Sequence, residues 1–198
     1  MSAVFRNIVL QALPSAERLQ LHLASLDPAA VQDLADDFAA SLPEFDILLG
    51  LPGTEALMNA LARLRGVPAV VIPLRAHGAQ VALPVERPGA VAVLVTHLLD
   101  SAIPELQALL FASHHGLEVP VVAAAVERSS GLGRTRLELL NIKVRAAIPV
   151  ADTPRGLCEE RRTPTLPDQG SWTIEPPRGL RLTTPDDLQN QTQKVTAG

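Results

Sequence analysis

Two kinds of hydrophobic pattern alternate along the first 150 residues of the chain. Short, nearly continuous apolar runs are typical of strands that are buried on both faces of a sheet. The segments between them place apolar residues three or four positions apart, which is the spacing of one helical face. The predicted strands are 46–51, 67–72, 91–95, 119–126 and 143–150, and the predicted helices are 27–42, 55–65, 103–115 and 135–140. This alternation predicts an α/β domain with a mainly parallel sheet flanked by helices.

Specific residues mark where some of these elements begin and end. Asp27 can cap a helix and Pro28 suits its first position, whereas Gly66 suits the end of the second helix. Between Arg18 and Leu23, apolar and polar residues alternate at every second position. That period predicts a half-exposed strand near the amino terminus.

The character of the sequence changes at about residue 151. Six of the 17 prolines (positions 154, 164, 167, 176, 177 and 185) lie beyond this point, among polar and charged residues. The change predicts a domain at 1–150 and an extended, Pro-rich C-terminal arm at 151–198, with one short strand at 172–174.

Composition narrows the classes of partner. Aromatic residues make up only 3% of the chain and the formal net charge is −4, which opposes nucleic-acid binding. No apolar run approaches the roughly 18 residues of a membrane span. The one cysteine, Cys158, cannot form an intramolecular disulfide, and Met1–Arg6 lacks the features of a signal peptide. We therefore expect a cytoplasmic protein with no nucleic-acid or membrane partner.

Several segments occur in an order that resembles one enzyme family. The pattern includes the helix around 34–41, the strand at 46–49, the segment 66–71, and the run 91–116. The most specific part is Ala125-Val-Glu-Arg-Ser129, followed by Gly133-Arg134. Over 18–150 the chain resembles the type I phosphoribosyltransferases, closest to the bacterial xanthine and purine enzymes. The resemblance implies their α/β fold, with its parallel sheet flanked by helices.

The resemblance also implies a chemistry and a set of site residues. These enzymes transfer the phosphoribosyl group of phosphoribosyl pyrophosphate (PRPP) to a purine nitrogen, with Mg²⁺, and are usually dimers. Their pair of ribose-binding acids aligns with Thr96 and His97. Their phosphate-binding loops align with Gly53 and Thr54 and with Ser101 and Ala102, and their base-contacting lysine aligns with Arg128.

The aligned positions depart from the pattern that PRPP binding needs. Neither Thr96 nor His97 is an acid, and Asp100 places a negative charge beside a phosphate loop, although it could also replace the lost acids. Ala102 stands where the family has a glycine that allows close backbone approach, and Pro104 removes an N–H donor. The PRPP motif is therefore expected to be degenerate.

Three functions stay open at this point. The first is a catalytically silent or regulatory protein that binds a purine nucleotide or another phosphate ligand. The second is an active purine phosphoribosyltransferase that uses Mg²⁺ and a divergent site, and the third is a non-enzymatic interaction protein. Each is compatible with a homodimer.

Two further features have alternative interpretations. His97 is either a structural residue at the end of a strand or a ligand of a metal other than Mg²⁺, and the residues alone predict no metal site. A basic cluster is either a solvated rim or a contact for an anionic ligand. Its members are Arg128, Arg134, Arg136, Lys143 and Arg145.

Overall fold

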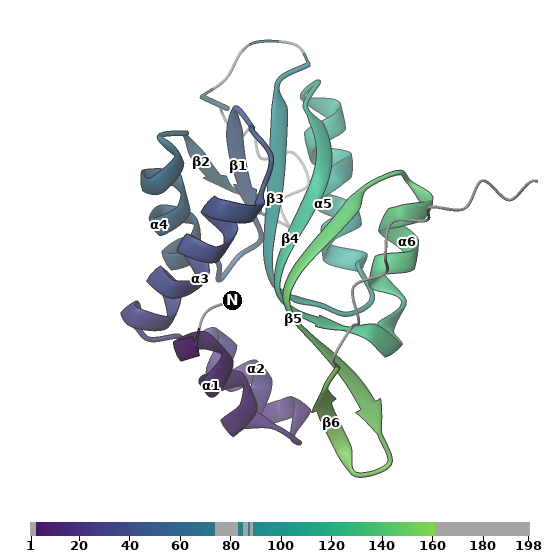
Figure 1. Ribbon diagram of the computed structural model, residues 1–198. Helices are drawn as coiled ribbons and strands as arrows, with labels where there is room; N and C mark the ends of the chain where they lie inside the picture. The colour runs from purple at the N-terminus through teal and green to yellow at the C-terminus, as the bar shows by residue number, and fades with distance from the viewer. Residues whose placement is uncertain (1–2, 74–82, 85–86, 88, 161–198) are drawn as a thin grey trace, which may run out of the picture. The chain divides into compact units, whose positions relative to one another are not determined.

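Six strands form one sheet in the computed structural model, which describes residues 3–73, 83–84, 87 and 89–160. The strand order is β2-β1-β3-β4-β5-β6 (Figure 1). The first five strands in this order are parallel, and β6 pairs with β5 in the antiparallel direction. The strands are β1 (Ile47–Gly50), β2 (Ala69–Val71), β3 (Val91–Leu99), β4 (Glu118–Arg128), β5 (Lys143–Thr153) and β6 (Gly156–Glu159). The predicted α/β fold with a mainly parallel sheet is confirmed.

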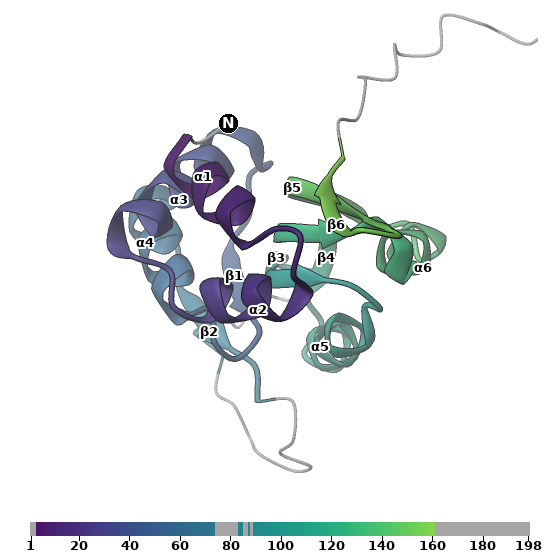
Figure 2. The same cartoon turned by 90° about the horizontal axis from the view of Figure 1, so that it is seen from below.

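Helices cover both faces of this sheet (Figures 1 and 2). They are α1 (Ala3–Ala12), α2 (Ala16–Ala24), α3 (Pro28–Ser41), α4 (Glu55–Arg65), α5 (Ile103–His114) and α6 (Gly133–Leu139), with a short 3₁₀ turn at Ser129–Gly131. Helices α1 to α4 contribute to one hydrophobic cluster, and α5 and α6 contribute to a second cluster on the opposite face. Among the described residues, no helix is long and apolar enough to cross a membrane.

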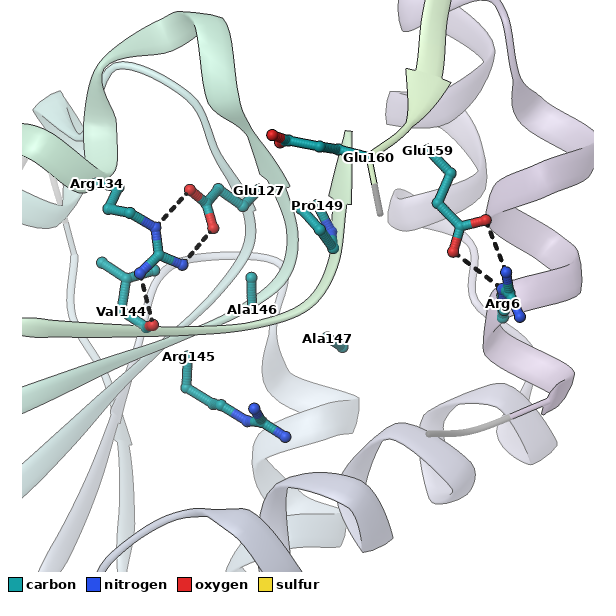
Figure 3. Close-up of a pocket in the computed structure, with 10 residues that line it drawn as sticks. All are labelled: Arg6, Glu127, Arg134, Val144, Arg145, Ala146, Ala147, Pro149, Glu159 and Glu160. Atoms are coloured by element: carbon teal, nitrogen blue, oxygen red, sulfur yellow. Dashed lines mark hydrogen bonds and ion pairs between the residues drawn. The ribbon is translucent and has the colours of Figure 1, made fainter. Parts of the chain in front are cut away.

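The amino-terminal helices α1 and α2 lie by the carboxyl ends of the parallel strands (Figures 1 and 2). The turn between them is tied to the β5–β6 hairpin, because the Leu157 amide donates to the Pro14 carbonyl at 2.9 Å. Arg6 of α1 forms a two-bond ion pair with Glu159 of β6, at 3.0 and 2.9 Å (Figure 3). These contacts fix the two ends of the described chain against each other.

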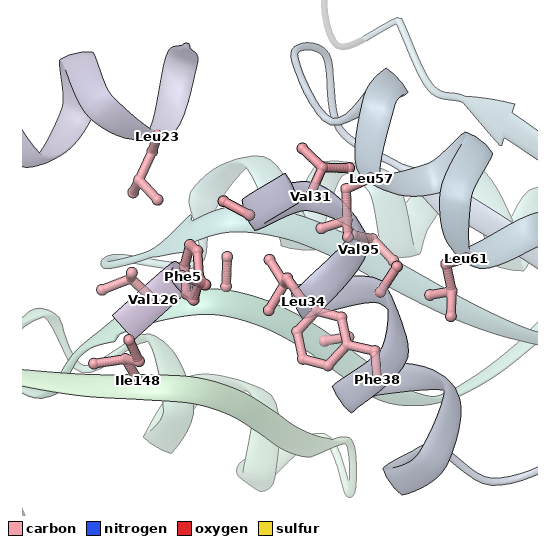
Figure 4. Packing of buried hydrophobic residues seen from close by; sticks show 14 of the residues in the cluster. Phe5, Leu23, Val31, Leu34, Phe38, Leu57, Leu61, Val95, Val126 and Ile148 are labelled. Carbon is pink, nitrogen blue, oxygen red and sulfur yellow. The ribbon is translucent and has the colours of Figure 1, made fainter. Parts of the chain in front are cut away.

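The larger cluster shows why the central strands are apolar at nearly every position. On β3, Val93 and Val95 face α1 to α4, while Leu94 faces α5 and α6. Figure 4 shows Val95 among side chains from α3 and α4, and Phe38 is fully buried there. Burial on both faces makes the apolar run continuous, since alternate residues of a strand point to opposite sides.

Helix boundaries follow the local sequence where a specific residue sets them. The Asp27 side chain accepts the Ala30 amide at 2.7 Å, and Pro28 is the first residue of α3. Gly66 ends α4 in the left-handed conformation, with a φ of 67°. Both predicted boundaries are confirmed, as is the start of α5 at Ile103.

The strand predicted between Arg18 and Leu23 is wrong, because this segment lies in helix α2. Ser15 caps the helix by accepting the Arg18 amide at 3.2 Å. Leu19 and Leu23, four positions apart, are buried against the core, whereas Leu21 is 63% exposed. The period of two arose because a leucine also occupies an exposed helical position.

The sheet extends past residue 150. Strand β5 runs to Thr153, and β6 follows it within the segment predicted as the start of the arm. The rest of the arm, including the strand predicted at 172–174, lies outside the described residues, as does most of the segment between the predicted strands at 67–72 and 91–95.

Candidate functional site

The carboxyl ends of β1, β3 and β4 bring the predicted site residues to the same end of the sheet. Parallel α/β sheets bind ligands at this end. The loops after β3 and β4 are in contact, because a Cβ added to Gly131 would clash with Asp100 Oδ1. Gly133 is equally constrained, since a Cβ at this position would clash with the carbonyl oxygen of Asp100. Only glycine allows the two loops to approach so closely.

Thr96 and His97 lie within β3 rather than after it, since the strand continues to Leu99. The shorter strand predicted at 91–95 is therefore corrected. Thr96 is 3% exposed and pairs with Ala124 of the neighbouring strand. Its side chain is thus part of the interior, where it hydrogen-bonds to a buried carboxylate, that of Glu105.

Glu105 is the functional candidate that the sequence did not single out. It lies in the first turn of α5, is 1% exposed, and has a carboxylate oxygen, Oε1, without a hydrogen-bond partner among the described residues. Burial raises its pKa, although its own backbone amide and the Thr96 hydroxyl favour the charged form. The amino end of a helix attracts anions, and here the chain's own carboxyl group lies there.

His97 has a different environment from Thr96. Its side chain is half-buried, and burial lowers the pKa of the imidazole. The negative charge of Glu55 opposes this shift but is the smaller effect. A neutral imidazole can bind a metal, but no group of three or more His, Cys, Asp or Glu side chains in the described part of the chain could hold a metal ion. The residues that replace the acid pair therefore do not fit Mg²⁺, which prefers oxygen ligands.

The loop after β1 uses its donors internally. The Gly53 amide donates to the Glu55 carboxylate at 3.2 Å. The Thr54 hydroxyl and amide both donate to the Leu51 carbonyl, at 2.7 and 3.2 Å, and Thr54 is 1% exposed. The groups that the resemblance assigns to a phosphate are thus already hydrogen-bonded within the chain.

Arg128 is held in the same way at the end of β4. Its Nε and Nη2 donate to the two carboxylate oxygens of Asp152, at 2.8 and 2.6 Å, and its Nη1 lies 3.5 Å from Asp100 Oδ2. Ser130 also donates to Asp152. Arg128 and Ser130 lower the pKa of Asp152 to about 2, so this acid is charged at neutral pH.

Ser101 and Ala102 form the loop that leads into α5. Ala102 has a left-handed backbone conformation, with a φ of 60°, and gives the helix no side-chain cap. Glycine adopts this conformation freely, whereas alanine adopts it at some cost. Arg136 of α6 donates to the Ser101 carbonyl at 2.6 Å, and this bond links the loop to α6.

A buried ion pair underlies the loop after β4. Glu127 is 1% exposed, and Arg134 donates to both of its carboxylate oxygens, at 2.8 and 2.6 Å (Figure 3). Arg134 also reaches the Val144 carbonyl at 3.1 Å. The sequence contained both residues within the family-like segment, but the spacing of seven positions gave no sign that they pair.

The predicted basic cluster is divided by the fold. Arg128, Arg134 and Arg136 bond to acids or carbonyls of the loops just described. Lys143 and Arg145 lie at the opposite end of the sheet, because they begin β5. The cluster is therefore spread over both ends of the sheet, although Arg134 and Arg145 border the same cavity.

The sequence matches no known family model and no curated protein, whereas many solved structures share the fold. A phosphoribosyltransferase from Corynebacterium diphtheriae is 17% identical over 74% of this chain and 94% of its own, with a TM-score of 0.60. Adenine phosphoribosyltransferase from Saccharomyces cerevisiae is 17% identical over 73% of this chain and 98% of its own, with a TM-score of 0.54. UMP synthase from Leishmania donovani is 23% identical over 67% of this chain but only 28% of its own, with a TM-score of 0.54. At such identities these likenesses establish the fold: the chain has the architecture of the type I phosphoribosyltransferases.

Proposed function

We propose that this phosphoribosyltransferase-like chain is a non-catalytic, regulatory protein of nucleotide metabolism. One observation carries the proposal: the donors of the loop after β1 that would bind a phosphate of PRPP are already bonded within the chain. Gly53 donates to Glu55, and Thr54 donates to a backbone carbonyl. A phosphate would have to displace these partners before it could bind.

The charges at this end of the sheet also oppose PRPP. Asp100 and Asp152 lie against Arg128, and the carboxyl group of Glu105 lies at the amino end of α5. Negative charges that lie close together repel each other, so these carboxylates disfavour the binding of a negatively charged pyrophosphate group. Thr96 and His97 supply no carboxylate for the ribose hydroxyls. The described residues do not offer a fitting set of ligands for Mg²⁺.

A neutral purine base or nucleoside is the ligand best suited to what remains. Arg128 Nη1 is 3.5 Å from Asp100, which is too long for a strong hydrogen bond. This nitrogen can therefore donate to a carbonyl of a base, while Asp152 keeps the guanidinium in place. A purine nucleotide would bind through the same contact to its base, but less tightly, because the acids at this end of the sheet repel its phosphate.

A thermal-shift series tests the ligand, because a ligand that binds only the folded state raises the melting temperature. We expect a shift with purine bases or nucleosides, and none with pyrophosphate or with PRPP and Mg²⁺. Arg128→Gln should abolish the shift, whereas Arg155→Gln, the same change on the neighbouring β5–β6 turn, should leave it unchanged.

An enzyme assay tests the lack of catalysis. Pyrophosphate release from PRPP should be absent with adenine, guanine, hypoxanthine, xanthine and orotate. Turnover with any of these bases would overturn the proposal and restore the active-enzyme hypothesis, with Asp100 as the first residue to substitute.

A second candidate function, self-association, is favoured by the surface of α5. Ile103 and Leu110 are 56% and 63% exposed, whereas Glu105 on the same helix is buried, which inverts the usual pattern. A symmetric dimer would cover this face of α5 with the same face of a second copy. Light scattering should then give a dimer, and the double substitution Ile103→Ser with Leu110→Ser should give a monomer.

A further inference from the structure

A cavity lies at the opposite end of the sheet from the candidate site. It has a volume of about 670 Å³ and lies between the end of α3 and the beginnings of β4 and β5. Leu42, Pro120 and Val121 give it an apolar wall, and Ser41 and Asn141 add polar groups. The volume is within the range of about 300–1,000 Å³ that is usual for small-molecule sites.

Two cations from one strand line this cavity. Lys143 and Arg145 are two positions apart on β5, so their side chains leave the same face of the sheet. The register of the sheet places them beside Val121 and Ala123 of β4. Arg145 Nε donates to the Ser41 hydroxyl at 3.2 Å, which is a neutral partner.

Neither cation is neutralised by the part of the chain that the structure describes. The ion pairs among the described residues do not include Lys143 or Arg145. The acid at the cavity, Glu44, has a side chain that is 97% exposed and lies 3.5 Å from Arg65. The carboxylate of Glu44 is thus paired with Arg65 rather than with Arg145.

Arg145 also borders the neighbouring cavity of about 600 Å³, where the contrast with other arginines is direct (Figure 3). In that cavity, Arg134 is bonded to Glu127 and Arg6 is bonded to Glu159, each through two hydrogen bonds. Figure 3 shows Arg145 extending from β5 with no bond to any other residue drawn. Among the described residues, Arg134 and Arg6 are therefore paired with acids, whereas Arg145 donates to a neutral hydroxyl.

We propose that the cavity between α3 and β5 binds a small organic anion, a carboxylate or phosphate attached to an apolar body. The guanidinium of Arg145 can hold two oxygens of such a group in a planar fork, and Lys143 adds a second positive charge. The apolar wall holds the rest of the molecule. This site is separate from the carboxyl-end site and does not depend on the proposed regulatory function.

The test uses the full chain and four probes that separate the anion from the apolar body. Phenyl phosphate and benzoate carry both the anion and the apolar body, whereas inorganic phosphate and benzyl alcohol each carry only one of them. Nuclear magnetic resonance titration locates binding through the backbone amides. We expect phenyl phosphate or benzoate to move the amides of 41–44 and 141–145, and to bind at least several-fold more tightly than the two single-feature probes. The tighter binder of the two, phenyl phosphate or benzoate, identifies the preferred anion as phosphate or carboxylate.

Variants separate specific binding from general charge attraction. Arg145→Gln should weaken binding about tenfold, since a charge-assisted bidentate contact is lost, and Lys143→Gln should weaken it less. Arg145→Lys keeps the charge without the fork and should give an intermediate affinity. Arg63→Gln, the same loss of charge at an exposed position of α4, is the matched control and should have no effect. These side chains are exposed, so thermal unfolding should verify that each variant remains folded.

Three results would overturn the inference. They are no amide shifts near 41–44 and 141–145 with either anionic probe, equal weakening by Arg63→Gln and Arg145→Gln, or binding of inorganic phosphate as strong as that of phenyl phosphate. Shifts confined to Gly53, Asp100 and Arg128 would instead place anion binding at the carboxyl end, and would contradict both this inference and the proposed function. Failure here together with a purine-induced thermal shift would leave the proposed function intact.

Discussion

The two ends of the sheet treat their charged side chains differently. At the carboxyl end, Arg128 and Arg134 each bond to a carboxylate of the chain. At the beginning of β5, Lys143 and Arg145 face a cavity and no acid of the described residues pairs with them. A charged side chain that pairs with an acid of the chain fixes loops in place. A charged side chain that has no acidic partner among the described residues is available to a ligand. The fold would suggest the first end as the binding site for anions, but the charges favour the second.

The largest expected effect comes from the buried pair under the carboxyl-end loops. Arg134→Met removes both hydrogen bonds to Glu127, which is 1% exposed. Removal of one partner of a buried ion pair typically costs about 3–5 kcal/mol, so we expect the free energy of unfolding to fall by about 3 kcal/mol. Denaturant unfolding measures the change.

The double variant Arg134→Met with Glu127→Gln is the control for this prediction. It removes the buried charge together with its partner, so part of the lost stability should return. If Arg134→Met alone changes the stability by less than 0.5 kcal/mol, roughly the size of a surface substitution, the pair does not anchor these loops.

A smaller effect, and a gain, is expected at Glu105. Burial raises its pKa in the folded state, so its ionisation costs stability as the pH rises from the ordinary glutamate value through the raised value. Glu105→Gln removes that cost, because a neutral amide has no charge to desolvate, although it remains a buried polar group. The melting temperatures of the two proteins should coincide below about pH 4 and diverge at neutral pH, with the variant higher. Equal melting temperatures at pH 7 would contradict the prediction.

The smallest effect on stability is expected at the exposed pair of Arg128 and Asp152. The pKa of Asp152 is lowered to about 2. The contribution of this pair to folding stability is therefore complete when the pH is above the ordinary pKa of aspartate, and it is lost as the pH falls through about 2. In Arg128→Gln, the pKa of Asp152 should rise toward about 4. Carbon nuclear magnetic resonance titration of the carboxyl group measures it. A pKa that stays near 2 without Arg128 would show that Ser130 holds this acid, and would weaken the contrast between the two ends.

The elements that could be predicted are those whose signal lies within a few neighbouring residues. Asp27 and Pro28 begin α3, and Gly66 ends α4, because caps act within one helical turn. The apolar runs of β3 and β4 identified central strands, because both faces of a central parallel strand are buried. The type of fold followed from this order of elements.

Predictions failed where the surroundings outweighed the local pattern. The segment from Arg18 to Leu23 alternates like a strand, yet it folds as α2 because Leu19 and Leu23 pack on the core. Strand β3 passes beyond residue 95 to include Thr96 and His97, because Ala124 and later residues of β4 continue the pairing. A polar residue looks like the end of a strand until its neighbour in the sheet is known.

The sequence by itself determined the order of strands and helices from α3 to β5, the boundaries at Asp27 and Gly66, and the absence of an acid pair at Thr96 and His97, since these are properties of residue type and of neighbours along the chain. Only the tertiary structure decided which charges are neutralised. The pairs Glu127–Arg134 and Arg6–Glu159 join elements that are distant in sequence or turned toward each other by the fold, and the burial of Glu105 depends on how α5 packs on β3. Electrostatic energy depends on distance and burial in space, which sequence spacing does not specify.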